Sequence, residues 1–151
     1  MKVEALSLDF VSHYPEWHHV LFTVKDADNS IRFYSDYLGM AAVQDQRDSD
    51  GKRWVSLRFA ENPYAPLFVL VEDTPAKKGP SAAASSLKTF CFRLLDLKPV
   101  EEISAKAKAA GCLVEASQYG GNLRGYFCVV SDPDGNLMEF SHVIAPKTGG
   151  N

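Results

Sequence analysis

One pattern of residues occurs twice in this chain, at an offset of seventy positions. The segment His19–Asp26 has apolar residues on one strand face and ends in aspartate, and the segment Thr89–Asp96 repeats that pattern. Other residues match at the same offset: Gly51 with Gly121, Leu57 with Phe127, Phe59 with Val129, and Leu67 with Leu137. Self-similarity at a fixed spacing is typical of folds built from repeated supersecondary units. The sequence therefore predicts two copies of one module.

Each copy is expected to contain one strand, one helix and three further strands. Alternating apolar residues predict the strands, and apolar residues at helical spacing before Gly39 predict the first helix. Pro99 and Gly111 bracket the second helix in the order that helices prefer. The expected elements of the first module lie at about 18–25, 30–38, 40–47, 53–60 and 66–72. Those of the second lie at about 88–95, 99–110, 112–118, 124–131 and 137–143.

The predicted fold class is α+β, with two βαβββ modules. Each half-sheet has a helix on one face, so the uncovered faces of the paired half-sheets are expected to form a cup with the helices outside. Such a concavity is the usual place for a small ligand. With 151 residues, the chain has room for one compact domain. We expect an N-terminal extension at 1–16, modules at 17–73 and 88–144, a Pro/Ala/Ser/Lys/Gly-rich linker at 74–87, and a tail at 145–151.

The bulk composition excludes several classes of partner. The net charge is −3 and no long run of Lys or Arg occurs, so no nucleic-acid partner is expected. No apolar run has membrane-spanning length, and the N-terminal residues lack a secretory pattern. The three cysteines, Cys91, Cys112 and Cys128, are odd in number and lie in strand-like apolar runs. Buried thiols in a reducing compartment are the simplest interpretation, and a cytoplasmic protein is expected.

Three segments resemble one known superfamily. They are the strand His19–Asp26, the helix Ser30–Met40 with its Phe-Tyr…Leu-Gly-Met end, and Ser131–Phe140 with Asp-Pro-Asp-Gly-Asn before a Glu-bearing strand. In this order and spacing they resemble the glyoxalase/bleomycin-resistance/dioxygenase, or vicinal oxygen chelate, superfamily, across about 17–143. The resemblance implies a βαβββ-module fold, often a homodimer, whether swapped or unswapped. Its members include isomerases, epimerases, dioxygenases, thiol transferases and metal-free drug-binding proteins.

The resemblance also implies metal-ligand positions on the first and last strand of each module. These positions fall on His19 and Glu139, and the repeat offset places the other two on Thr89 and Val69. Val has no donor atom, and a neutral Thr hydroxyl is a poor ligand for a divalent ion. Two of the four ligands are therefore lost. A weakly held Fe, Mn, Ni or Zn ion at His19 and Glu139 remains one possibility, and no cofactor at all is the other.

Strand parity suggests further residues facing the cup. Val55, Leu57 and Phe59 are expected to face the helix, which leaves the neighbouring side chains for the ligand. The ligand-binding candidates are Trp54, Arg58, Cys91, Arg93 and Tyr126, the last on the same strand face as Cys128. The two arginines would clamp a carboxylate or phosphate. Alternatively they lie in solvent at strand ends, or pair with Glu61 or Glu72.

Two functional hypotheses follow. In the first, the protein is a metal-dependent lyase, isomerase or dioxygenase, in which a metal at His19 and Glu139 polarises substrate oxygens and Glu139 is the catalytic residue. In the second, it is a metal-free protein that sequesters a small molecule. Two other roles for these residues stay open: His19 and Glu139 form an ion pair with no reaction, or Glu139 acts as a general base without metal.

Overall fold

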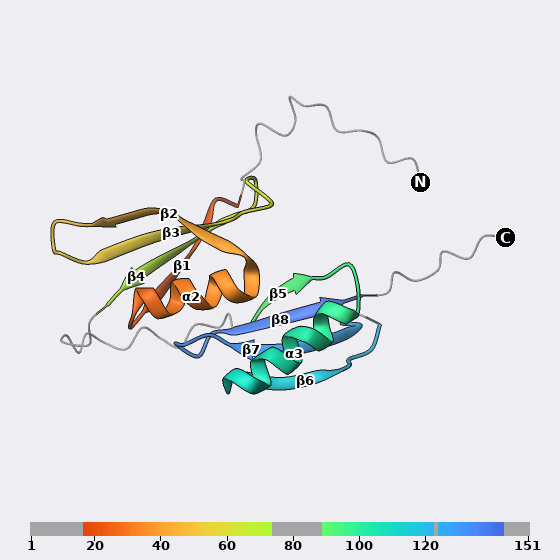
Figure 1. Ribbon diagram of the computed structural model, residues 1–151. Coiled ribbons are helices and arrows are strands. Elements are labelled where there is room, and N and C mark those ends of the chain that lie inside the picture. Colours follow the sequence, from red (N-terminus) through yellow and green to blue (C-terminus); the bar gives the residue numbers. More distant parts are fainter. Residues whose placement is uncertain (1–16, 74–88, 123, 144–151) are drawn as a thin grey trace, which may run out of the picture.

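The computed structural model describes residues 17–73, 89–122 and 124–143. The expected N-terminal extension at 1–16, linker at 74–87 and tail at 145–151 lie outside these residues. The first half contains β1 (His19–Val24), α2 (Ala27–Leu38), β2 (Met40–Arg47), β3 (Arg53–Phe59) and β4 (Leu67–Glu72). The second half contains β5 (Thr89–Arg93), α3 (Lys98–Ala110), β6 (Leu113–Tyr119), β7 (Tyr126–Ser131) and β8 (Leu137–His142). The α+β fold with two βαβββ modules is confirmed (Figure 1).

The two modules have the same sheet topology. The strand orders are β1-β4-β3-β2 and β5-β8-β7-β6, and the first and last strands of each module pair in parallel. His19 lies opposite Leu67 in the first sheet, and Thr89 lies opposite Leu137 in the second. These four residues match at the seventy-residue offset, so the repeat extends to the register between the first and last strands of each module.

Helix α2 begins three residues earlier than the sequence predicted. Asp26 is its N-cap, and the Asp26 carboxylate accepts a hydrogen bond from the backbone N–H of Asn29. The expectation of a start at Ser30 is wrong because Asp26, and not the later polar residues, satisfies the first free N–H groups. The helix ends at Gly39, which adopts the left-handed conformation (φ 61°) that glycine tolerates best.

The helix-bearing faces of both modules meet in one hydrophobic core. Phe22, Leu57 and Phe68 from the first sheet belong to the same buried cluster as Met138 and Phe140 from the second. Figure 1 shows α2 on the side of the first sheet that faces the second module. Each sheet therefore has its open face turned away from the shared core within one chain.

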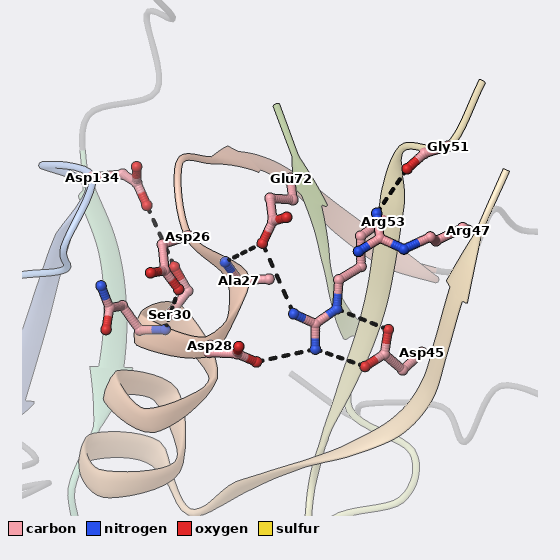
Figure 2. Close-up of polar contacts among 11 residues, drawn as sticks. Asp26, Ala27, Asp28, Ser30, Asp45, Arg47, Gly51, Arg53, Glu72 and Asp134 are labelled. Atoms are coloured by element: carbon pink, nitrogen blue, oxygen red, sulfur yellow. Dashed lines mark hydrogen bonds and ion pairs between the residues drawn. The ribbon is translucent and has the colours of Figure 1, made fainter. Parts of the chain in front are cut away.

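Polar contacts at the start of α2 also join the modules. The Asp134 carboxylate, on the β7–β8 turn, accepts a hydrogen bond from the backbone N–H of Lys25. It also accepts one from the Ser30 hydroxyl (Figure 2). One turn further along α2, the Tyr34 hydroxyl donates to the buried Asp132 carboxylate at 2.6 Å. The Asp-Pro-Asp-Gly-Asn turn of the second module is thus bound to the helix of the first.

A second set of contacts in Figure 2 surrounds Arg53 on β3. Its guanidinium binds the carboxylates of Asp45 on β2 and Asp28 on α2, at 2.8 and 3.0 Å. Glu72 on β4 accepts a hydrogen bond from the backbone N–H of Ala27. Arg53 therefore joins the first helix to its sheet.

In the part of the chain described, no helix is long and apolar enough to cross a membrane.

Candidate functional site

The open face of the second sheet carries a compact group of polar side chains. Met138 and Phe140 on β8 belong to the core, so the alternation of a strand turns Glu139 and Ser141 to the opposite face. Cys91 on β5 is the register partner of Glu139, and Val129 on β7 is its partner on the other side. Glu139 is only 8% exposed, which is unusual for a carboxylate.

Both oxygens of Glu139 have protein partners. The Ser141 hydroxyl donates to Oε1 at 2.7 Å, and the Cys91 thiol lies 3.5 Å from the same atom. The Arg124 guanidinium donates to Oε2 from Nη2 at 2.7 Å and from Nε at 3.2 Å. Burial of an anion without partners is costly, and this cation with its hydrogen bonds offsets that cost.

The backbone before β7 determines where Arg124 reaches. Gly125 has φ 64°, and a Cβ atom there would lie 2.2 Å from the backbone oxygen of His142. Only glycine fits so close an approach with a positive φ. This turn directs Arg124 across the open face, where its guanidinium carbon lies 3.4 Å from the ring centre of Phe127. Arg124 therefore stacks on Phe127 while it binds Glu139.

These contacts shift the pKa values of Glu139, Cys91 and Arg124, and the last is raised by its hydrogen bonds to Glu139. Burial alone would raise the pKa of Glu139, but hydrogen bonds from Arg124 and Ser141 outweigh it, and the net pKa is lowered. Glu139 is consequently an anion at neutral pH. Partial desolvation of the thiol, followed by the nearby Glu139 charge, raises the pKa of Cys91, although the residue as a whole is exposed. Cys91 is therefore protonated at neutral pH and is a hydrogen-bond donor, not a thiolate ligand.

The predicted candidates on the first sheet lie on a different surface. His19 on β1 is exposed, and its Nδ1 atom is 2.9 Å from Nδ1 of His18. Trp54 on β3 is half-buried and its indole donates to Asp48, whereas Arg58 is exposed and lines a small pocket beside His18 and Tyr64. No described contact joins any of these side chains to Glu139.

Two predicted ligand-binding residues of the second sheet remain to be placed, Arg93 and Tyr126. Arg93 is exposed on β5, where Ser141 is its register partner. Cys128 lies under α3, with its thiol 3.6 Å from the backbone oxygen of Val100. Because Tyr126 shares a strand face with Cys128, Tyr126 is on the helix-bearing side. The expectation that this face is open was wrong, since β7 is buried on both faces and its apolar pattern does not reveal which face the helix covers.

The donor set around Glu139 is poorly suited to a divalent metal. Within the described ranges, no group of three or more His, Cys, Asp or Glu side chains is arranged to hold an ion. Val69 and Thr89 stand at the other two implied positions, and the Glu139 oxygens are occupied by Arg124, Ser141 and Cys91. A guanidinium bound to this carboxylate repels a second cation. These residues do not fit a divalent ion in this arrangement.

Arg124 and Ser141 were missed by the sequence analysis. Ser141 shares the strand face of Glu139, two residues on, and parity would have found it. Arg124 precedes the strand, and the turn at Gly125 breaks the alternation on which parity depends. Nothing in the local sequence predicts that its side chain reaches Glu139.

Comparison with known proteins extends these observations. The family model described as "Glyoxalase/Bleomycin resistance protein/Dioxygenase superfamily" matches residues 17–140. The uncharacterized protein PA2024 of Pseudomonas aeruginosa is 30% identical over 128 residues, which cover 85% of this chain and 89% of the relative.

Two solved structures show the same fold at low identity. A glyoxylase/bleomycin resistance protein/dioxygenase domain from Frankia sp. EAN1pec has a TM-score of 0.69 and 17% identity, covering 87% of this chain and 99% of that one. A mutant of the fosfomycin resistance protein FosX from Listeria monocytogenes, complexed with Mn(II) and 1S,2S-dihydroxypropylphosphonic acid, has a TM-score of 0.65 and 13% identity. It covers 87% of this chain and 95% of that one.

Proposed function

Because the chain belongs to the glyoxalase/bleomycin resistance protein/dioxygenase superfamily, we propose that it binds a small molecule on the open face of its second sheet, without a resident divalent metal. The observation that carries this proposal is the 2.7 Å contact between Arg124 Nη2 and Glu139 Oε2. It supplies the carboxylate with a positive partner from the chain itself. The protein then acts as a binding protein, the second of the two functions considered from the sequence.

The accessible part of this site is the guanidinium. The Arg124 side chain is 40% exposed and the Glu139 side chain 11%. Nε and Nη2 of Arg124 are engaged by Glu139, whereas Nη1 donates no hydrogen bond to any described residue. Nη1 is therefore the group that meets an oxygen acceptor on a ligand, and Glu139 fixes the orientation of the guanidinium plane.

Two copies of the chain are proposed to enclose the site. The open faces point away from the core that the modules share, and β1 and β5 each have a strand partner on one side only in the described sheets. Unpaired strand edges invite pairing with another chain. A homodimer that sets the open face of one chain's first sheet against the second sheet of the other would close the cup.

The metal-dependent enzyme is the second candidate. Its support is that His19 and Glu139 occupy two of the positions that the family resemblance implies. The FosX structure was solved with Mn(II), but at 13% identity that likeness concerns the fold. For a metal to bind Glu139 in this chain, Arg124 would have to release the carboxylate.

Metal binding separates the two candidates. The purified protein is analysed for metal content, and its thermal unfolding is followed with Mn²⁺, Fe²⁺, Ni²⁺ and Zn²⁺. A ligand that binds only the folded state raises the unfolding temperature by mass action. We expect no stoichiometric metal and no shift. A stoichiometric metal that is lost in both His19→Ala and Glu139→Ala would establish the metalloprotein in place of this proposal.

Ligand binding is tested with simple probes. Benzoate and its neutral counterpart benzamide are titrated while the Arg124 Nε–H resonance is followed by NMR. We expect benzoate to shift that resonance saturably and benzamide to have a smaller effect. Arg124→Met should abolish the benzoate response elsewhere on β7 and β8, whereas Arg47→Met, at an exposed arginine of the first sheet, should retain it. Equal responses in these two variants would rule out Arg124 as the contact.

A further inference from the structure

A cavity lies between the two modules of the chain, and we call it the seam cavity. Its volume is about 310 Å³, and five aromatic side chains contribute to its wall: Trp17, Phe59 and Phe68 from the first module, and Phe90 and Phe92 from β5. This volume is at the lower end of the range for small-molecule sites.

The seam cavity is separate from the Glu139 site. Val20 also lines it, and alternation along β1 puts Val20 on the same face as the buried Phe22 and Val24, opposite to His19. Phe68 and Phe90 likewise pack with the core that lies under the helices. The ring-lined wall of the cavity is therefore on the helix-bearing side of the sheets, whereas Glu139 and Arg124 are on the open side. Thr89 and Cys91, on the Glu139 face of the edge strand β5, complete the wall at that edge.

The rings around the seam lie at ordinary aromatic contact distances. Ring centres are 6.0 Å apart for Phe68 and Phe90, 6.1 Å for Phe59 and Phe92, and 6.3 Å for Phe68 and Phe92. Phe68 is buried, but Phe59, Phe90 and Phe92 are only half-buried. These three rings leave apolar surface in contact with water, and a flat ring placed among them would bury it at about 25 cal/mol per Å².

The wall of the seam cavity has no charge among its described residues. Its polar groups are the Trp17 indole N–H, the Thr89 hydroxyl and the Cys91 thiol. Thr89 and Cys91 are on the edge strand β5, and Cys91 borders the Glu139 site as well. An ionised ligand would lose its hydration there without a compensating partner. A neutral ligand with one hydroxyl or carbonyl group could exchange a hydrogen bond with Thr89.

We propose that the seam cavity binds an uncharged, flat aromatic molecule of one or two rings carrying a single hydroxyl or carbonyl group. Such a molecule packs its rings among Phe68, Phe90 and Phe92 and directs its oxygen toward Thr89. The inference is independent of the function proposed above, because the ring-lined wall and the Arg124 guanidinium lie on opposite sides of the sheets.

The test uses 2-naphthol as the probe and Trp17 as the reporter. The chain has two tryptophans, so Trp54→Phe leaves Trp17 as the only one. We expect 2-naphthol to quench Trp17 emission saturably, and isothermal calorimetry of the unmodified protein to give the same affinity.

Two substitutions fill the cavity. Val20→Phe and Thr89→Phe should each weaken 2-naphthol binding at least tenfold. Thr89 is exposed, so its variant folds even if the larger side chain at Val20 is not tolerated. Leu21→Phe is the matched control, because Leu21 is the neighbour of Val20 on the opposite face of β1 and is 48% exposed. Glu139→Gln should also leave the affinity unchanged.

Three results would overturn the assignment. One is the absence of saturable binding up to the solubility of 2-naphthol. Another is a loss in Leu21→Phe equal to that in Thr89→Phe. The third is loss of binding in Glu139→Gln, which would assign the probe to the open-face site. Failure of benzoate to bind at Arg124, by contrast, leaves this proposal intact.

Discussion

Arg124 and Glu139 form a bidentate contact across the open face of the second sheet, with Nη2 and Nε both donating to Oε2. Ser141 and Cys91 bind the other carboxylate oxygen. The network leaves Glu139 anionic and short of free lone pairs. The acid stability of the protein and the reactivity of Cys91 are expected to depend on this anionic state of Glu139.

Glu139 is expected to make the stability of the protein fall in acid. The pKa of Glu139 in the folded protein is below the usual value of 4.5. The contribution of ionised Glu139 to the free energy of unfolding is therefore fully present above that value, and it is lost as pH falls through the lowered pKa. Urea unfolding between pH 3 and pH 7 measures this. Glu139→Gln should remove part of the acid-dependent slope. A slope unchanged in Glu139→Gln would contradict the ion pair.

Tyr34→Phe should destabilise the protein by about 1.5–3 kcal/mol, the usual range for a hydrogen bond to a charged group. The substitution removes the donor to the buried Asp132 and keeps the ring. Tyr37→Phe is the control, because the hydroxyl of the half-buried Tyr37 contacts the Cys112 sulfur, at 3.3 Å, and no other polar group of the described residues. Urea unfolding at neutral pH should show a clearly larger loss for Tyr34. Equal losses would mean that Asp132 does not depend on this hydroxyl.

Arg53→Met is expected to cost about 1 kcal/mol at low ionic strength, since the carboxylates of Asp28 and Asp45 are well exposed and solvent screens the pairs. The loss should shrink in 1 M NaCl. Arg47→Met provides the comparison, because within the part of the chain that the structure describes Arg47 donates to the backbone oxygen of Gly51 and to no carboxylate (Figure 2). If salt affects both variants alike, the carboxylate network around Arg53 contributes nothing specific.

The three thiols should react in a fixed order. Cys91 is exposed, Cys112 is half-buried and Cys128 is buried, where desolvation raises its pKa to about 11. Iodoacetamide at pH 8 should label Cys91 first and Cys128 only on unfolding, as read by mass spectrometry of peptides. Glu139→Gln should accelerate labelling of Cys91, because the carboxylate charge is one cause of its raised pKa. Slower labelling in that variant would contradict this cause.

The sequence predicted the module plan because the repeat and the strand alternation are local signals. The helix-facing positions Val55 and Leu57 are fully buried as expected, since period-two patterning decides the faces of a half-exposed strand. Period-two patterning gave the wrong face for Tyr126, whose strand β7 is buried on both faces. On β7, alternation divides the side chains between two faces, but it does not indicate which face the helix covers.

The site itself was predictable only in part. Glu139 followed from the family resemblance, and its partner Cys91 followed from strand register. Arg124 depends on the positive φ of Gly125 and on the length of its own side chain, neither of which alternation describes. The metal-binding role of His19 and Glu139 stays a prediction, as do the ligand-binding roles of Trp54, Arg58 and Arg93.

The β7–β8 turn of the second module supplies hydrogen-bond acceptors to the first helix, through Asp134 and Asp132. If either module unfolds, buried groups of the other module lose their hydrogen-bond partners. Heat should consequently melt the chain in a single cooperative step, with calorimetric and van't Hoff enthalpies in agreement.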